Sequence, residues 1–113
     1  MKEVEIKKQI LLKQIGAKIA YYRTLREMKQ SELARRARIS RSALSRIERG
    51  KYNDNVSVVI LSDIAEALQI DIALLVTFND MEKNMWWNAL PPETKESEEQ
   101  EENEEQFPEE LDD

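Results

Sequence analysis

The stretch QSELARRARISRSALSRIERG, residues 30–50, decides the fold of this chain. Two short helices are predicted within it, one that opens near Gln30 and one that runs from Arg41 to Arg49. Ser40 can accept a hydrogen bond as the N-cap of the second helix, and Gly50 can adopt the left-handed conformation that ends it. The stretch therefore predicts two short helices separated by a turn.

The second of these helices has two chemically different sides. Leu44, Ile47 and Glu48 recur at i, i+3 and i+4, so we expect this side to face the rest of the protein. The other side carries Arg41, Ser42, Ser45, Arg46 and Arg49. Guanidinium groups match the O6 and N7 acceptors of guanine, and hydroxyls can bind phosphates or bases, so this side is suited to DNA. A charged side that faces only solvent explains the same pattern.

Helical periodicity continues on both sides of this stretch. Upstream, a long first helix is predicted from about Val4 to Arg26. Its apolar stripe consists of Ile15, Ile19, Tyr22 and Leu25. Downstream, Ser57 can cap a fourth helix, and a fifth is predicted near residues 72–78. No strand is predicted, and five short helices indicate a compact all-α domain with one core.

The composition excludes several classes of protein. The 113 residues include no Cys, no His and only 2 Gly. A disulfide scaffold, a Cys/His zinc site, a His general base and a Gly-rich phosphate loop are therefore excluded. No apolar run is long enough to span a membrane, and residues 1–12 lack the features of a signal peptide. We expect a cytoplasmic, non-enzymatic helical protein that needs no cofactor or metal and binds no membrane.

The net charge of −6 conceals two oppositely charged parts. Residues 1–52 hold 15 Lys and Arg against 5 Asp and Glu, a net charge of +10. Residues 91–113 hold 1 Lys against 12 acidic residues, a net charge of −11. The basic part can present its own positive field, so the acidic total does not argue against a nucleic-acid partner.

Residues 30–50 resemble the helix-turn-helix of the Cro/cI-type (XRE) family of DNA-binding transcriptional regulators. The features that match are Gln30, the run Glu32-Leu33-Ala34, Ile39 in the turn, and Ile47-Glu48-Arg49-Gly50. The likeness extends through Ile15–Glu27 and Leu61–Val76. It implies a compact five-helix, lambda-repressor-like domain over residues 15–78, with the helix-turn-helix at 30–49. Residues 1–14 would then extend the first helix.

The resemblance also implies roles for individual residues. The recognition helix would lie in the major groove with its N-terminal end on the base edges. Its expected base contacts are Arg41, Ser42, Ser45 and Arg46. The expected contacts to the DNA backbone are Gln30, Arg49, Lys51 and Asn53. Glu48, on the core side of a basic helix, is expected to form a mostly buried ion pair with Arg23 of the first helix.

Three positions depart from the family pattern. Glu27 and Arg38 stand where the family often has Gly or Asn, at helix ends that require a positive φ. Each is expected to cost about 1–2 kcal/mol if the left-handed conformation is kept. Lys29 replaces the residue that usually caps the second helix, so that cap should be lost.

Two segments lie outside the resemblance. Residues 79–90 carry Met81, Met85, Trp86 and Trp87. These side chains either pack on the domain itself or form a surface for self-association or for a protein partner. Residues 91–113 begin with two prolines and hold two apolar residues, so we expect a disordered acidic tail. The tail is read either as a solubilising segment, as a partner-binding segment, or as a competitor for the protein's own basic face.

The sequence thus predicts a bacterial or phage transcriptional regulator, a repressor that binds double-stranded DNA as a homodimer. An antitoxin-like protein is the main alternative, with operator DNA bound by the helix-turn-helix and a partner protein by residues 79–113. A helical adaptor that no longer binds DNA is a third interpretation. It predicts no salt-dependent affinity for duplex DNA.

Overall fold

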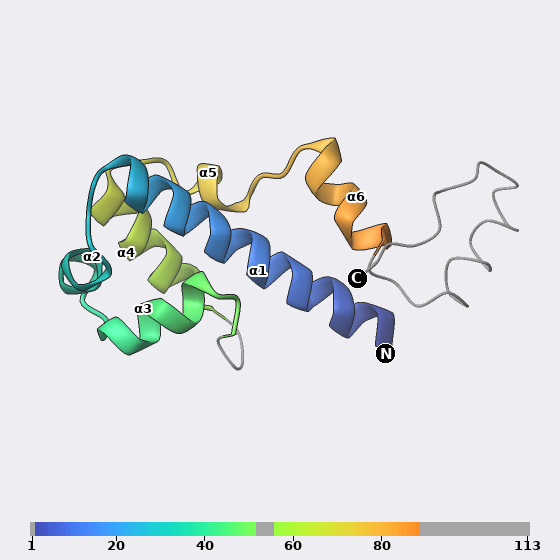
Figure 1. The fold of residues 1–113 in the computed structure, drawn as a ribbon, viewed down its shortest axis with the longest axis horizontal. Helices are drawn as coiled ribbons and strands as arrows, with labels where there is room; N and C mark the ends of the chain where they lie inside the picture. The colour runs from blue at the N-terminus through green and yellow to red at the C-terminus, as the bar shows by residue number, and fades with distance from the viewer. Residues whose placement is uncertain (1, 52–55, 89–113) are drawn as a thin grey trace, which may run out of the picture. The chain divides into compact units, whose positions relative to one another are not determined.

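The computed structural model describes residues 2–51 and 56–88, and the chain is α-helical throughout these two ranges wherever it is regular (Figure 1). The helices are α1 (Lys2–Leu25), α2 (Gln30–Ala37), α3 (Arg41–Glu48), α4 (Val58–Leu68), α5 (Ala73–Val76) and α6 (Asp80–Asn88). The predicted all-α fold is confirmed, and the five helices expected in the domain begin and end within a few residues of the predicted bounds. Within these ranges, no helix combines the length and the apolar character that crossing a bilayer would require.

Of the described residues, 11–51 and 56–77 form one compact unit, and 2–10 and 78–88 belong to another. Within residues 11–77, α2 packs against both α3 and α4. The core contains apolar side chains from every helix of this unit: Ile15, Ile19, Leu33, Ala34, Ala37, Leu44, Ile47, Leu61, Ile64, Ala65, Leu68 and Leu75. The short helices α2 to α5 need this shared core, because helices of 4 to 11 residues are not stable alone in water.

The N-terminal ends of the helices agree with the caps predicted from the sequence. The Ser40 hydroxyl accepts a hydrogen bond from the Ala43 amide at 3.0 Å, at the start of α3. The Ser57 hydroxyl likewise accepts a hydrogen bond from the Ile60 amide at 3.1 Å, at the start of α4. Lys29 precedes α2 and makes no capping hydrogen bond with its side chain, so the predicted loss of that cap is confirmed.

The C-terminal ends of α1, α2 and α4 use non-glycine residues with a positive φ. Glu27 has φ 58°, Arg38 has φ 62° and Gln69 has φ 60°. At the end of α2, the Arg38 amide donates to the Arg35 carbonyl and the Ile39 amide to the Ala34 carbonyl, the Schellman arrangement. The left-handed conformations predicted at Glu27 and Arg38 are confirmed, whereas the one at Gln69 was not predicted.

Helix α1 crosses the C-terminal end of α3 at very short range. A Cβ atom added at Gly16 would lie 2.6 Å from the carbonyl oxygen of Glu48 and would also collide with the carbonyl oxygen of Ile47. At Gly50, which has φ 69°, a Cβ atom would lie 2.6 Å from the Cα atom of Lys13. These two glycines allow the backbones of α1 and of the end of α3 to come into direct contact.

In the other unit, residues 79–90 contain the helix α6. The Asn79 side chain accepts a hydrogen bond from the Glu82 amide, and the Glu82 carboxylate accepts one from the Asn79 amide, both at 2.8 Å. This reciprocal pair is a capping box. Met81 is 76% exposed and Met85 is 53% exposed. The side chains of Trp86 and Trp87 and the predicted disordered tail, residues 91–113, lie outside the described part of the chain.

Candidate nucleic-acid interface

The two sides of α3 differ in burial. On the inner side Leu44 and Ile47 are buried, and the Glu48 side chain is only 5% exposed. On the outer side Arg41, Ser42, Arg46 and Arg49 are exposed, and Ser45 is half-buried. The Arg49 guanidinium Nε donates to the Ser45 carbonyl at 3.2 Å, which fixes this side chain along the last turn of the helix. The structure thus brings four of the predicted DNA-contacting side chains to one accessible face.

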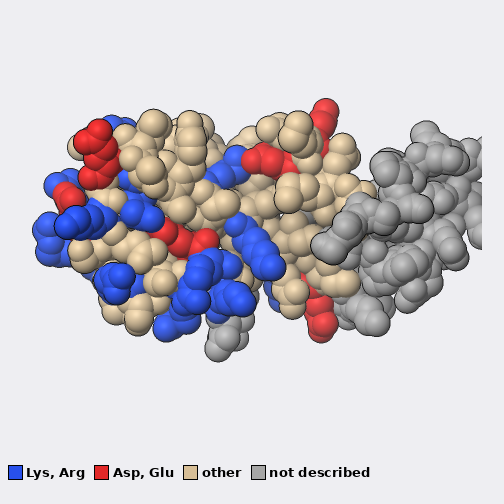
Figure 2. Space-filling view, viewed as in Figure 1, with Lys and Arg blue, Asp and Glu red and all other residues tan. Residues whose placement is uncertain are grey.

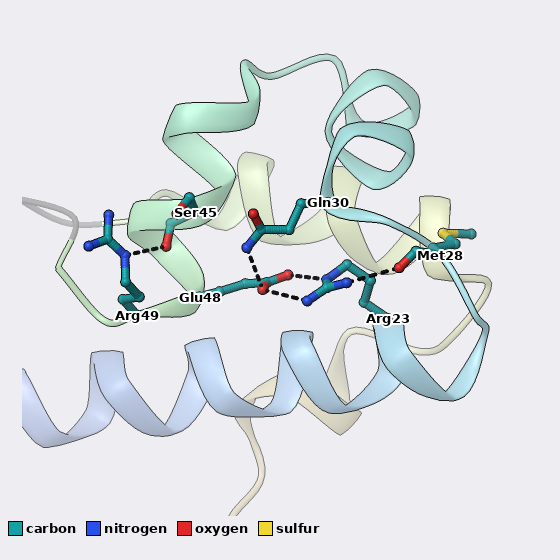
Figure 3. A network of polar contacts seen from close by, with 6 residues as sticks. All are labelled: Arg23, Met28, Gln30, Ser45, Glu48 and Arg49. Atoms are coloured by element: carbon teal, nitrogen blue, oxygen red, sulfur yellow. Dashed lines mark hydrogen bonds and ion pairs between the residues drawn. The ribbon is translucent and has the colours of Figure 1, made fainter.

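Glu48 joins α3 to α1 through Arg23 (Figure 3). The Arg23 Nε atom lies 2.7 Å from Glu48 Oε2, and Nη2 donates to Oε1 at 3.1 Å. The third guanidinium nitrogen, Nη1, donates to the carbonyl oxygen of Met28 at 2.9 Å. Arg23 is 19% exposed on its side chain, so both partners of the expected ion pair are largely removed from water. One guanidinium therefore holds the α1–α2 turn and the end of α3 together.

Gln30 adds the start of α2 to the same network. Its Nε2 atom donates to Glu48 Oε1 at 2.9 Å, so one carboxylate receives hydrogen bonds from both α1 and α2 (Figure 3). Sequence reasoning assigned Gln30 to a DNA phosphate and missed this internal contact. Because the carboxamide has two N–H donors, the bond to Glu48 leaves a second donor for a phosphate. The predicted phosphate contact of Gln30 therefore stays a prediction.

Basic side chains gather over the part of the surface formed by α2 and α3 (Figure 2). Arg35, Arg36 and Arg38 on and after α2 are all exposed. Arg36 pairs with Glu32 at 3.0 Å, four residues earlier on the same helix. Such an exposed pair contributes little to stability. The charges of these arginines add to the positive field of this surface.

The remaining predicted contacts lie after α3. Lys51 is exposed and directly follows Gly50. Asn53 lies outside the described residues. In the two described ranges, no group of three or more His, Cys, Asp or Glu side chains is arranged to hold a metal ion. The chemistry that this face offers is therefore that of guanidinium, ammonium and hydroxyl donors, which bind phosphates and base edges.

The sequence and the fold are similar to those of known regulators. A family model described as "Helix-turn-helix" matches residues 19–75. The immunity repressor protein of Bacillus phage phi105 is 39% identical over 62 residues, which are 55% of this chain and 42% of the phage protein. The chain therefore matches less than half the length of this relative.

Two solved structures share the fold. One is the restriction-modification controller protein C.AhdI from Aeromonas hydrophila, at 33% identity and a TM-score of 0.54, over 57% of this chain and 94% of that one. The other is the clp gene regulator ClgR from C. glutamicum, at 28% identity and a TM-score of 0.55, over 66% of this chain and 90% of that one. The match to C.AhdI spans nearly that whole protein, so the likeness covers a complete domain.

Proposed function

This chain belongs to the Cro/cI-type (XRE) helix-turn-helix family of DNA-binding transcriptional regulators, and we propose that it represses transcription by binding a specific double-stranded DNA sequence through α3. The similarity to a phage immunity repressor supports repression rather than activation. The regulator would act on bacterial or phage DNA in the cytoplasm, and it would have no catalytic role.

The contrast between the two sides of α3 carries this proposal. The inner side is anchored by Leu44 and Ile47 in the core and by the hydrogen-bonded Glu48. The outer side offers exposed donors at Arg41, Ser42 and Arg46, together with the half-buried Ser45. A helix that is rigidly attached along one side can enter the major groove with the other side without reorganising.

In the proposed complex, the N-terminal turn of α3 reads bases while residues around it bind phosphates. Arg41, Ser42, Ser45 and Arg46 contact base edges. Gln30, Arg49, Lys51 and Asn53 contact the DNA backbone. Contacts of the second group fix the register on the duplex but carry no sequence information, so specificity depends on the first group.

A homodimer follows from the small size of one reading surface. A single short helix contacts few base pairs, whereas a two-fold pair of domains reads half-sites about 34 Å apart on one face of the duplex. Met81 of α6 is exposed, as a side chain in a surface for self-association or for a partner protein would be. The antitoxin-like alternative stays a prediction: co-purification of a second protein that is lost on truncation after Leu90 would support it.

Selection of bound sequences from random DNA, followed by binding titrations with point variants, tests the proposal. Arg41→Ala should cost about 1–3 kcal/mol of binding free energy and relax the preference at one base position. Gln30→Ala should weaken binding to all sequences alike, and it serves as the comparison. If both variants lost affinity equally and without regard to sequence, Arg41 would not be a base-reading residue. A titration of the unmodified protein with no salt dependence would refute DNA binding itself.

A further inference from the structure

The end of α3 touches α1 at a residue that lies outside the match to the family model. The family model begins at residue 19, whereas the backbone of Gly50 lies against Lys13, six positions earlier on α1. A Cβ atom at Gly50 would be 2.5 Å from the Cγ atom of Lys13 and 2.9 Å from its backbone nitrogen. Lys13 is therefore an immediate neighbour of the residues that follow the recognition helix.

This contact creates a local excess of positive charge. Arg49 and Lys51 are the chain neighbours of Gly50, the residue that Lys13 contacts, and all three basic side chains are exposed. Neither Lys13 nor Lys51 forms an ion pair with another residue in the described ranges. Three basic residues around one backbone contact, without a described acidic partner, give this region a positive field that attracts an anion.

The length of α3 places this cluster near a phosphate strand in the proposed complex. The eight residues of α3, Arg41–Glu48, span about 12 Å of helix, and the major groove is about 12 Å wide. When the N-terminal end of the helix reads bases, its C-terminal end therefore reaches the edge of the groove, where the sugar-phosphate backbone runs. A lysine ammonium suits a phosphate there, because it acts as a point charge and needs no fixed orientation.

We propose that Lys13, beside Arg49 and Lys51, binds a DNA phosphate at the C-terminal end of the recognition helix. This inference rests on the proposed function and adds to it a contact from the extended first helix. The contact is independent of sequence, because it is made to the backbone. It therefore strengthens binding to any duplex by the same factor.

The test uses the full chain with the substitution Lys13→Gln, titrated with the selected operator and with a random duplex at 50 and 200 mM salt. Each phosphate contact contributes about −0.9 to the slope of log K against log salt, so the variant should lose about one such unit on both duplexes. Between the two salt concentrations, the affinity of the unmodified protein should thus fall about 3.5-fold more than that of the variant.

Two further variants control for net charge and for folding. Lys8→Gln removes the same charge from an exposed position on the same helix, about 140° around the helix axis from Lys13, and should keep the full slope. Lys13→Arg retains the positive charge and should show the same salt slope as the unmodified protein. An unchanged slope for Lys13→Gln, or an equal loss for Lys8→Gln, would overturn the inference while the proposed function stands. No salt dependence in the unmodified protein would refute both.

Discussion

Replacing Gly16 by Ala tests how closely α1 crosses the end of α3. The added Cβ atom would lie 2.6 Å from the carbonyl oxygen of Glu48 and 2.8 Å from its carbonyl carbon. Both are backbone atoms, which cannot rotate away as the end of a side chain can. Either α1 or α3 must therefore shift for the variant to fold.

Two effects of opposite sign determine the stability of this variant. Ala is more favourable than Gly inside a helix by about 1 kcal/mol, which alone would stabilise α1. Forcing extra volume into a packed contact costs typically about 1–3 kcal/mol. Because the obstructing atoms belong to the backbone, we expect the upper end of that range and a net loss of about 2 kcal/mol. At roughly 4–8 °C per kcal/mol, the melting temperature should fall by about 8–16 °C.

Thermal or urea unfolding of the full chain measures this difference, and the neighbouring residue supplies the control. Ala17 is exposed on the same helix, so Ala17→Gly should report helix propensity alone and cost about 1 kcal/mol. If Gly16→Ala instead raised the stability by about the amount that Ala17→Gly lowers it, no crowding would exist at Gly16. The close crossing of α1 and α3 would then be wrong.

Two other substitutions test the anchoring of the short helices. Glu48→Ala removes the carboxylate that receives hydrogen bonds from Arg23 and Gln30. The free energy of unfolding should fall by about 3–5 kcal/mol, because a largely buried guanidinium loses its partner. Glu32→Ala is its control, since Glu32 pairs with Arg36 at the surface and should cost less than about 1 kcal/mol. A Glu48→Ala protein that melts within about a degree or two of the unmodified chain would contradict the role given to this network. Lys29→Ser should supply the missing cap of α2 and raise the unfolding free energy by about 1 kcal/mol, because Lys29 already has the extended backbone of an N-cap residue. Ser57→Ala removes an existing cap and should lower the unfolding free energy by a similar amount. If Lys29→Ser gave no gain, or Ser57→Ala no loss, side-chain caps would not contribute to the stability of these helices.

The fold was predictable because its determinants are local. The apolar spacing of each helix lies within one short stretch, and the caps at Ser40 and Ser57 involve residues three positions apart. The positive φ at Glu27 and Arg38 followed from the resemblance to the family. Gln69 was not anticipated, because neither Gln nor its neighbours signal a left-handed helix end as glycine does. The capping box of Asn79 and Glu82 has a signature in the sequence, because an Asn followed three residues later by a Glu is typical of a helix start.

The candidate site was predictable only in part. Which residues share the outer side of α3 follows from helix geometry alone. The hydrogen bond of Gln30 to Glu48 joins residues 18 positions apart, and its existence depends on the angle at which α2 packs against α3. The contact of Gly50 with Lys13 depends likewise on where α1 crosses α3. Such contacts depend on tertiary packing, which cannot be predicted from the spacing of residues along the chain.

The division of α3 into an anchored and an accessible side has a consequence for how such a regulator diversifies. Leu44, Ile47 and Glu48 attach the helix to the domain, while Arg41 and Ser42 on the opposite side are exposed. Exchanges at exposed positions usually alter the unfolding free energy by no more than about 0.5 kcal/mol. If the outer side of α3 reads bases as proposed, a few substitutions there can change the target sequence while the stability of the domain stays nearly the same.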